Sequence, residues 1–173
     1  METQKIGIDI GRVIIGAVQG GRADTSFLGS SDRKAMATPP SPHAFECIAR
    51  LVEAFDGEAW LVSKCGSNVQ RKTRLWLEAW DFYHQTGLEP GRVRFCKERP
   101  QKALICRELG ITHFVDDRVD IMQHLERCVP HRFLFGEQPR RVRIPHGVTP
   151  VVDWPTAERE VLKTLADAGA PTE

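Results

Sequence analysis

The chain has 173 residues, of which 24 are lysine or arginine and 23 are aspartate or glutamate, so the formal net charge at pH 7 is +1. This balance excludes a broad basic surface, and we expect neither nucleic acid nor a membrane as a partner. The length predicts a single domain over residues 1–173. The five cysteines form no CxxC pair, and neither a signal peptide nor an apolar run of about 20 residues is present, which predicts a cytoplasmic protein with free thiols.

Apolar runs, and the polar residues that separate them, predict the elements of residues 5–64. Residues 5–15 (KIGIDIGRVII) predict a strand that runs into a turn, with one acid, Asp9, inside the apolar run. Residues 16–43 are rich in Gly, Ser, Asp and Pro and predict a long loop or flap. Apolar residues at helical spacing then predict a helix over 44–56, and a short buried strand follows at 58–64.

The rest of the chain continues this alternation. In chain order we predict a helix (67–87), a strand (91–97), a helix (99–111), a strand with an acidic turn and a helix (112–128), a strand (131–136), irregular or edge structure (140–154) and a helix (155–169). Strands that alternate with helices of about a dozen residues indicate an α/β fold, in which a mostly parallel central sheet is covered by helices on both faces.

Polar side chains follow several of the predicted strands directly. Asp9 follows KIGI, Ser63 follows AWLV, and Asp116 and Asp117 follow THFV, while Lys102 opens the helix before the last of these strands. Ligands of parallel sheets bind at the carboxyl ends of the strands. We therefore expect three carboxylates, a hydroxyl and an ammonium group to meet at one edge of the sheet.

This set of groups suits phosphoryl transfer. Mg²⁺ prefers hard oxygen ligands, usually one or two carboxylates with water and substrate phosphate. Asp9 is placed to ligate the metal and attack phosphorus, which gives an aspartyl-phosphate intermediate. Ser63 and Lys102 are suited to hold the phosphate, and Asp116 and Asp117 to complete the surroundings of the metal.

Four segments in this order resemble the motifs of the haloacid dehalogenase-like (HAD) superfamily: IGIDIGRV, WLVS, the Lys102 segment RPQKALICRELG, and HFVDDRVD. The segment VDDRVDIM is similar to the 5′-deoxyribonucleotidase-like branch. The resemblance implies a three-layer Rossmann-like fold with a minimal cap and a Mg²⁺-dependent phosphohydrolase. It implies that Asp9 is the nucleophile and a metal ligand, with the Gly11 carbonyl, Asp116 and Asp117 as further ligands, and that Ser63 and Lys102 hold the phosphate.

The main departure from the family pattern is Gly11. HAD phosphatases normally carry a second aspartate two residues after the nucleophile, as general acid and base, and this chain has glycine there. One alternative is therefore a catalytically weakened homologue that binds metal, phosphate or a protein partner without efficient turnover. In the enzyme hypothesis, Arg12 or a residue of the flap assists proton transfer or charge stabilisation instead.

A lesser alternative comes from the opening segment IGIDIGRVIIGAV, which resembles the first strand of RNase H-like nucleases. That hypothesis leaves the VDDRVD segment and the lysine before it unexplained.

Three further features have two interpretations each. Lys97 competes with Lys102 for the site, and Lys102 is favoured. Trp76, Trp80 and Tyr83 share one helix face and predict a core stripe rather than a base-stacking platform. Arg140, Arg141 and Arg143 predict a solvated basic edge, with an anionic substrate or partner as the alternative.

Overall fold

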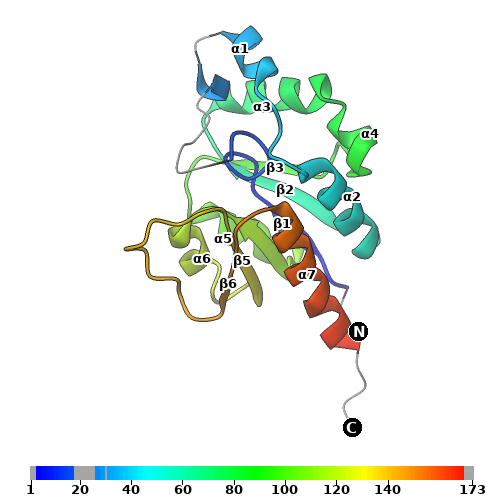
Figure 1. Cartoon of the computed structure of the whole chain (residues 1–173), viewed down its shortest axis with the longest axis vertical. Helices are drawn as coiled ribbons and strands as arrows, with labels where there is room; N and C mark the ends of the chain where they lie inside the picture. The colour runs from blue at the N-terminus through cyan, green and yellow to red at the C-terminus, as the bar shows by residue number, and fades with distance from the viewer. Residues whose placement is uncertain (1–2, 18–25, 30, 170–173) are drawn as a thin grey trace.

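The structure is a computed structural model, which describes residues 3–17, 26–29 and 31–169 (Figure 1). Its described strands form one six-stranded sheet in the order β3-β2-β1-β4-β5-β6, with every neighbouring pair parallel. The strands are β1 (Ile6–Ile8), β2 (Ala59–Lys64), β3 (Val93–Cys96), β4 (His113–Asp116), β5 (His131–Phe135) and β6 (Val148–Val151). The α/β prediction is confirmed, and the sheet is wholly rather than mostly parallel.

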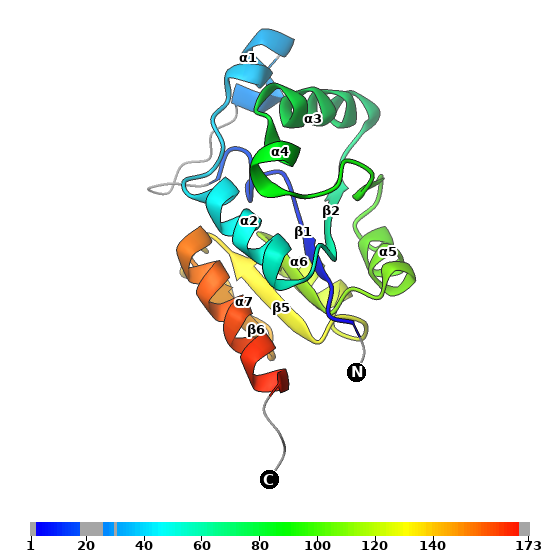
Figure 2. The ribbon, with the colours of Figure 1, turned by 90° about the vertical axis from the view of Figure 1, so that its right-hand side faces the viewer.

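Helices cover both faces of this sheet. The described helices are the 3-10 turn η1 (Ser26–Leu28), α1 (Asp32–Ala37), α2 (Ala44–Ala54), α3 (Ser67–Ala79), α4 (Phe82–Thr86), α5 (Gln101–Leu109), α6 (Val119–His124) and α7 (Trp154–Gly169). Figures 1 and 2 show α2 and α7 side by side on one face and α5 and α6 on the other, which gives three layers. Within the described ranges, no helix is long and apolar enough to cross a membrane.

The sheet separates two apolar clusters. The larger lies under α2, α3 and α7 and includes Ile6, Ile8 and Trp154, and the smaller lies under α5 and α6 and includes Phe114 and Met122. Parallel strands are buried on both faces, so their sequences read as continuous apolar runs rather than as alternating ones. This explains why apolar residues predominate in the described strands, as in the IGI of β1 and the AWLV of β2.

β1 is shorter than the apolar run that predicted it. After Asp9 the chain turns, and the amide nitrogens of Val13, Ile14 and Ile15 lie 3.2, 2.8 and 3.1 Å from the carbonyl oxygen of Ile10. These three side chains are nonetheless buried in the core. An aliphatic run predicts that its side chains are buried. Here the run is buried in a compact turn, and it does not continue the strand.

The single helix predicted over 67–87 is divided in two. α3 ends at Ala79, and Asp81 adopts a left-handed backbone with φ 52° before α4 begins. Trp76 is fully buried, and Trp80 and Tyr83 pack partly buried against the same core, so the prediction of a core stripe is confirmed.

The segment predicted as a loop or flap lies partly outside the described residues, at 18–25 and 30. Its described part contains η1 and α1, and it is docked on α3. The indole nitrogen of Trp76 donates to the Thr38 carbonyl at 2.8 Å, and the ammonium of the buried Lys72 donates to the Gly29 carbonyl at 2.5 Å. Two buried donors of α3 therefore hold this segment against that helix.

Candidate metal and phosphate site

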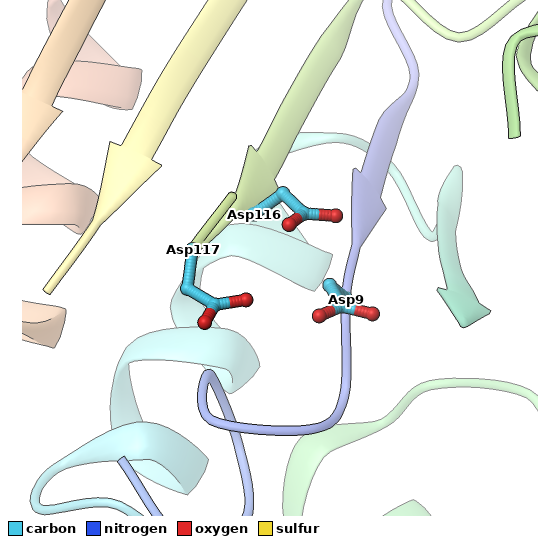
Figure 3. Close-up of side chains that lie close together, drawn as sticks. All are labelled: Asp9, Asp116 and Asp117. Carbon is cyan, nitrogen blue, oxygen red and sulfur yellow. The ribbon is translucent and has the colours of Figure 1, made fainter. Parts of the chain in front are cut away.

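The carboxyl ends of β1 and β4 bring three aspartates together. β1 and β4 are paired in register up to Ile8 and Val115, and the amide of Asp9 donates to the Val115 carbonyl at 2.9 Å. Asp116 ends β4, and Asp117 follows it. The carboxylates of Asp9, Asp116 and Asp117 each offer an oxygen within 4.8 Å of the others, and Figure 3 shows them around a common space.

Lys102 reaches this cluster from α5. Its ammonium nitrogen lies 2.8 Å from Oδ1 of Asp9 and 2.6 Å from Oδ2 of Asp116, and the residue is 2% exposed. Lys97, the competing candidate, is exposed on the surface. The structure therefore brings Lys102, and not Lys97, to the aspartates.

A close strand contact helps to place that lysine. The ammonium nitrogen of Lys102 lies 5.6 Å from the centre of the Phe114 ring. A Cβ atom on Gly7 of the neighbouring strand would lie 2.5 Å from the same ring, so only glycine leaves space for Phe114 in this position. Gly7 thus supports the site from the strand that carries Asp9.

The two adjacent aspartates have different surroundings. Asp116 is fully buried, with Oδ2 against Lys102 and Oδ1 accepting from the amide of Arg118 at 3.0 Å. Asp117 instead borders open cavities on either side. Asp120, the next acid along, is not part of the cluster, because its carboxylate is paired with Arg118 at 3.0 Å and with Arg99 at 3.4 Å.

The cluster contains three carboxyl groups and only one ammonium group, that of Lys102. Burial, followed by the nearby Asp9 carboxylate, raises the pKa of Asp116 to about 8 and that of Asp117 to about 6. For Lys102, burial disfavours the charged form, but the Asp9 and Asp116 carboxylates outweigh burial and raise its pKa. Three carboxylates facing one ammonium group would carry a net negative charge in a buried space, and a divalent cation would remove it. The donor set of hard oxygens fits Mg²⁺ for the same reason.

A cavity of about 450 Å³ opens in front of the cluster and gives a substrate access to it. Asp9, Gly11, Ser63, Lys102 and Asp117 all line this cavity, so five of the six residues expected at the site border one space. Ser63 comes from β2, whose carboxyl end lies beside that of β1. The predicted convergence of strand ends is thus observed.

Other walls of this cavity were not expected from the sequence. Phe27 and Leu28 line it from η1, and Val69 and Thr73 line it from α3. No local motif marks these positions, because they reach the site only through the docking of the segment 26–38 on α3. A contact prediction between these segments would have been needed to find them.

Gly11 has open space around it. A Cβ atom built at this position would meet no atom within 4 Å, and its φ is not in the left-handed region. Among the described residues, no backbone hydrogen bond ends on its carbonyl oxygen. The glycine is therefore not required by crowding or by backbone conformation, and an acidic side chain would fit there.

Comparisons with known proteins bear on the fold. No family model and no curated protein matches the chain. Among solved structures, a haloacid dehalogenase-like family hydrolase from Xanthomonas campestris superposes with a TM-score of 0.62 at 12% identity, covering 96% of this chain and 97% of that one. A histidinol dehydrogenase from Elizabethkingia anophelis has a TM-score of 0.41 at 7% identity, covering 91% of this chain and 29% of that one. The chain therefore has the Rossmann-like fold of HAD-like hydrolases, with a buried group of three aspartates at the carboxyl edge of its sheet.

Proposed function

We propose that the protein is a Mg²⁺-dependent phosphohydrolase in which Asp9 attacks the phosphorus atom of a phosphate ester. The observation that supports this most directly is the cluster itself. Three carboxylates lie within 4.8 Å of one another, Lys102 is bonded to two of them, and the group borders a cavity shared with Ser63.

The metal in this proposal is held by oxygen atoms alone. The carboxylates of Asp9, Asp116 and Asp117 would hold it, together with the Gly11 carbonyl. When bound, Mg²⁺ supplies charge stabilisation for the phosphoryl oxygens, which Lys102 alone cannot provide.

The chain's own residues divide the remaining tasks. Oδ1 of Asp9 accepts a hydrogen bond from the Lys102 ammonium group, which fixes the orientation of the carboxylate. Asp9 forms a bond to phosphorus as the ester oxygen departs, and water then hydrolyses the aspartyl-phosphate and releases phosphate. The Ser63 hydroxyl donates to a phosphoryl oxygen throughout. The departing oxygen takes its proton from water, since residue 11 has no side chain to give one.

A second candidate follows from the open space at Gly11. Loss of a positioned general acid and base typically lowers the rate by about 10²- to 10⁴-fold. A chain with the metal cluster intact and this side chain missing is suited to bind metal and phosphate, or a phosphorylated protein partner, with little turnover.

Hydrolysis assays separate the two candidates. The protein is incubated with Mg²⁺ and a panel of esters that includes phenyl phosphate, sugar phosphates and 5′-deoxyribonucleotides, beside Asp9→Asn and the surface control Asp167→Asn. We expect release of phosphate by the wild type and the control and none by Asp9→Asn. No hydrolysis by the wild type would defeat the enzyme proposal in favour of the binding module, and equal hydrolysis by all three would defeat the role of Asp9.

A cytoplasmic location is part of the same proposal. All five cysteines are free. A reducing compartment would keep them in that state, and it also supplies millimolar Mg²⁺ and phosphorylated metabolites.

A further inference from the structure

A second cavity adjoins the first at the aspartate cluster. It has a volume of about 410 Å³ and is lined by Phe135 and residues 136–139, and it shares Arg12 and Asp117 with the first cavity. Asp117 belongs to the carboxylate cluster, so this second cavity begins where the reacting phosphate would lie. Its volume is within the range of about 300–1,000 Å³ that is usual for small-molecule sites.

Arg12, which lines both cavities, has Asp117 as a charged neighbour, but its guanidinium makes no close ion pair with the described residues. Arg99 and Arg118 are both paired with Asp120, and Lys102 is paired with carboxylates of the cluster. Arg12, in contrast, makes no hydrogen bond or ion pair through its guanidinium with any residue that the structure describes. A planar guanidinium without a partner is suited to bind a carboxylate or phosphate through two hydrogen bonds.

The backbone holds Arg12 in this place at a cost. Its φ is 61°, in the left-handed region, which is unfavourable for a residue with a side chain. The amide of Arg12 donates to the Ile15 carbonyl at 2.7 Å, and the following amides converge on Ile10, so the turn is closed tightly. Backbone strain of this kind is found at functional positions, and here it fixes the Cα atom of Arg12 at the border of the two cavities.

The loop beyond the second cavity is basic as well. After Pro139 it carries Arg140, Arg141 and Arg143, which are exposed and make no ion pair with other described residues. Figure 1 shows this loop, in gold, extending past α6 between β5 and β6. Glu137 is the one acid between Gly136 and Gly147. The lining of the second cavity itself carries Arg12 with two acids, Asp117 and Glu137, and the three exposed arginines add positive charge beyond Pro139.

The wall of this cavity is tied to the cluster. The side-chain amide of Gln138 donates to the Asp117 carbonyl at 3.3 Å and to the Phe135 carbonyl at 3.1 Å. A ligand that contacts residues 136–139 would therefore contact a segment that is hydrogen-bonded to the backbone of Asp117.

We infer that the second cavity is a subsite for the leaving group, and that Arg12 selects small phosphate esters whose leaving group carries a second anion, either a carboxylate or another phosphate. This inference rests on the proposed phosphohydrolase function. It assigns Arg12 to substrate selection, outside the chemistry at Asp9.

Binding of two matched phosphonates tests the inference without turnover. Phenylphosphonate and 4-carboxyphenylphosphonate differ only in the second anion, and calorimetry with Mg²⁺ present measures the affinity of each for the full chain. We expect the carboxylated ligand to bind the wild type about tenfold more tightly, which corresponds to about 1.4 kcal/mol, because the carboxylate adds a charge-assisted hydrogen bond to Arg12. Arg12→Ala should abolish this preference, and Arg12→Lys should retain part of it.

Lys64 provides the matched control, since it is an exposed cation that lines the first cavity alone. Lys64→Ala should weaken both phosphonates alike and keep the preference. Equal affinities in the wild type, a preference that survives in Arg12→Ala, or failure of both ligands to bind would overturn the inference.

Hydrolysis of phenyl phosphate separates this inference from the proposed function. Hydrolysis with equal phosphonate affinities would overturn the leaving-group subsite alone. Discrimination between the phosphonates without hydrolysis would overturn the enzyme and support the anion subsite of a binding protein. Comparing a sugar monophosphate with its bisphosphate then shows whether a second phosphate satisfies Arg12 as a carboxylate does.

Discussion

The ammonium nitrogen of Lys102 lies 2.8 Å from Oδ1 of Asp9, although 93 positions separate the two residues. The same nitrogen lies 2.6 Å from Asp116, so a single cation holds two buried carboxylates together. Replacing Lys102 by an apolar side chain leaves those carboxylates without their cation, and only the Arg118 amide still donates to Asp116.

Lys102→Met should therefore lower the free energy of unfolding by about 3–5 kcal/mol, the usual effect of removing one partner from a buried ion pair. Lys97→Met is the control, because that lysine is exposed and should change stability by less than about 0.5 kcal/mol. Urea denaturation of both variants at pH 7.5 without metal measures the difference. Equal stability of the two variants would show that the cluster does not depend on Lys102.

Mg²⁺ should stabilise the protein. Binding to the native state alone adds about 2.7 kcal/mol when the metal is at 100 times its Kd, which corresponds to a rise in Tm of roughly 5–10 °C for a chain of this size. Asp117→Asn should reduce this rise, because it removes a charged ligand at the border of the cavity, while Asp167→Asn on α7 should keep it. Thermal scans with Mg²⁺ and with EDTA provide the measurement, and a rise that Asp117→Asn leaves intact would argue against the metal site.

Gly11→Asp should increase turnover. A Cβ at this position meets nothing within 4 Å, so a side chain can begin here without a clash. A positioned general acid and base contributes about 10²- to 10⁴-fold, and we expect kcat to rise toward the lower end of that range. Gly11→Asn is the isosteric control, since it adds the same volume without an ionisable group. Similar rates for the two variants would mean that proton transfer at this position does not limit the reaction.

Acid should destabilise the fold through His113. Burial lowers the pKa of this imidazole to about 3, and its two ring nitrogens lie 2.8 Å from the hydroxyls of Thr112 and Thr164. The unfolded chain binds a proton near pH 6.5 and the native chain does not, so stability is complete above that pH and falls as the pH drops from about 6.5 toward 3.

The expected loss at pH 5 is about 2 kcal/mol, from roughly 1.4 kcal/mol per pH unit over one and a half units. His113→Gln removes the titrating group, so its unfolding free energy should fall less between pH 7.5 and pH 5 than that of the wild type. His124→Gln, at an exposed position of α6, should retain the wild-type pH dependence. If His113→Gln has the same pH dependence of stability as the wild type, protonation of His113 is not the cause of the loss in acid.

Much of the fold could be predicted because its signals are local. Each strand of a parallel sheet is a short apolar run, and each run here is bounded by turn residues or by a helix of different periodicity. The strand at 148–151 was expected only as irregular or edge structure. It is an edge strand with Pro150 in it, and a residue that cannot donate to the sheet weakens the strand signal there.

Other elements depended on packing that no local pattern records. The run Val13–Ile15 has the composition of a strand and is a buried turn, because its amides are satisfied by the Ile10 carbonyl instead of by a neighbouring strand. The helix predicted over 67–87 is broken at Asp81 by a left-handed residue that is neither glycine nor asparagine. In both cases the tertiary contacts overrode the periodicity.

The sequence by itself determined where the site lies. Acids that directly follow apolar runs must meet at one edge once those runs form a parallel sheet, so Asp9, Asp116 and Asp117 were expected together. Only the tertiary structure decided which lysine joins them, that Gly11 has open space around it, and that the Arg12 guanidinium makes no hydrogen bond with the described residues. These properties depend on side-chain packing between segments far apart in the chain, whereas the order of strands and acids can be read directly from the sequence.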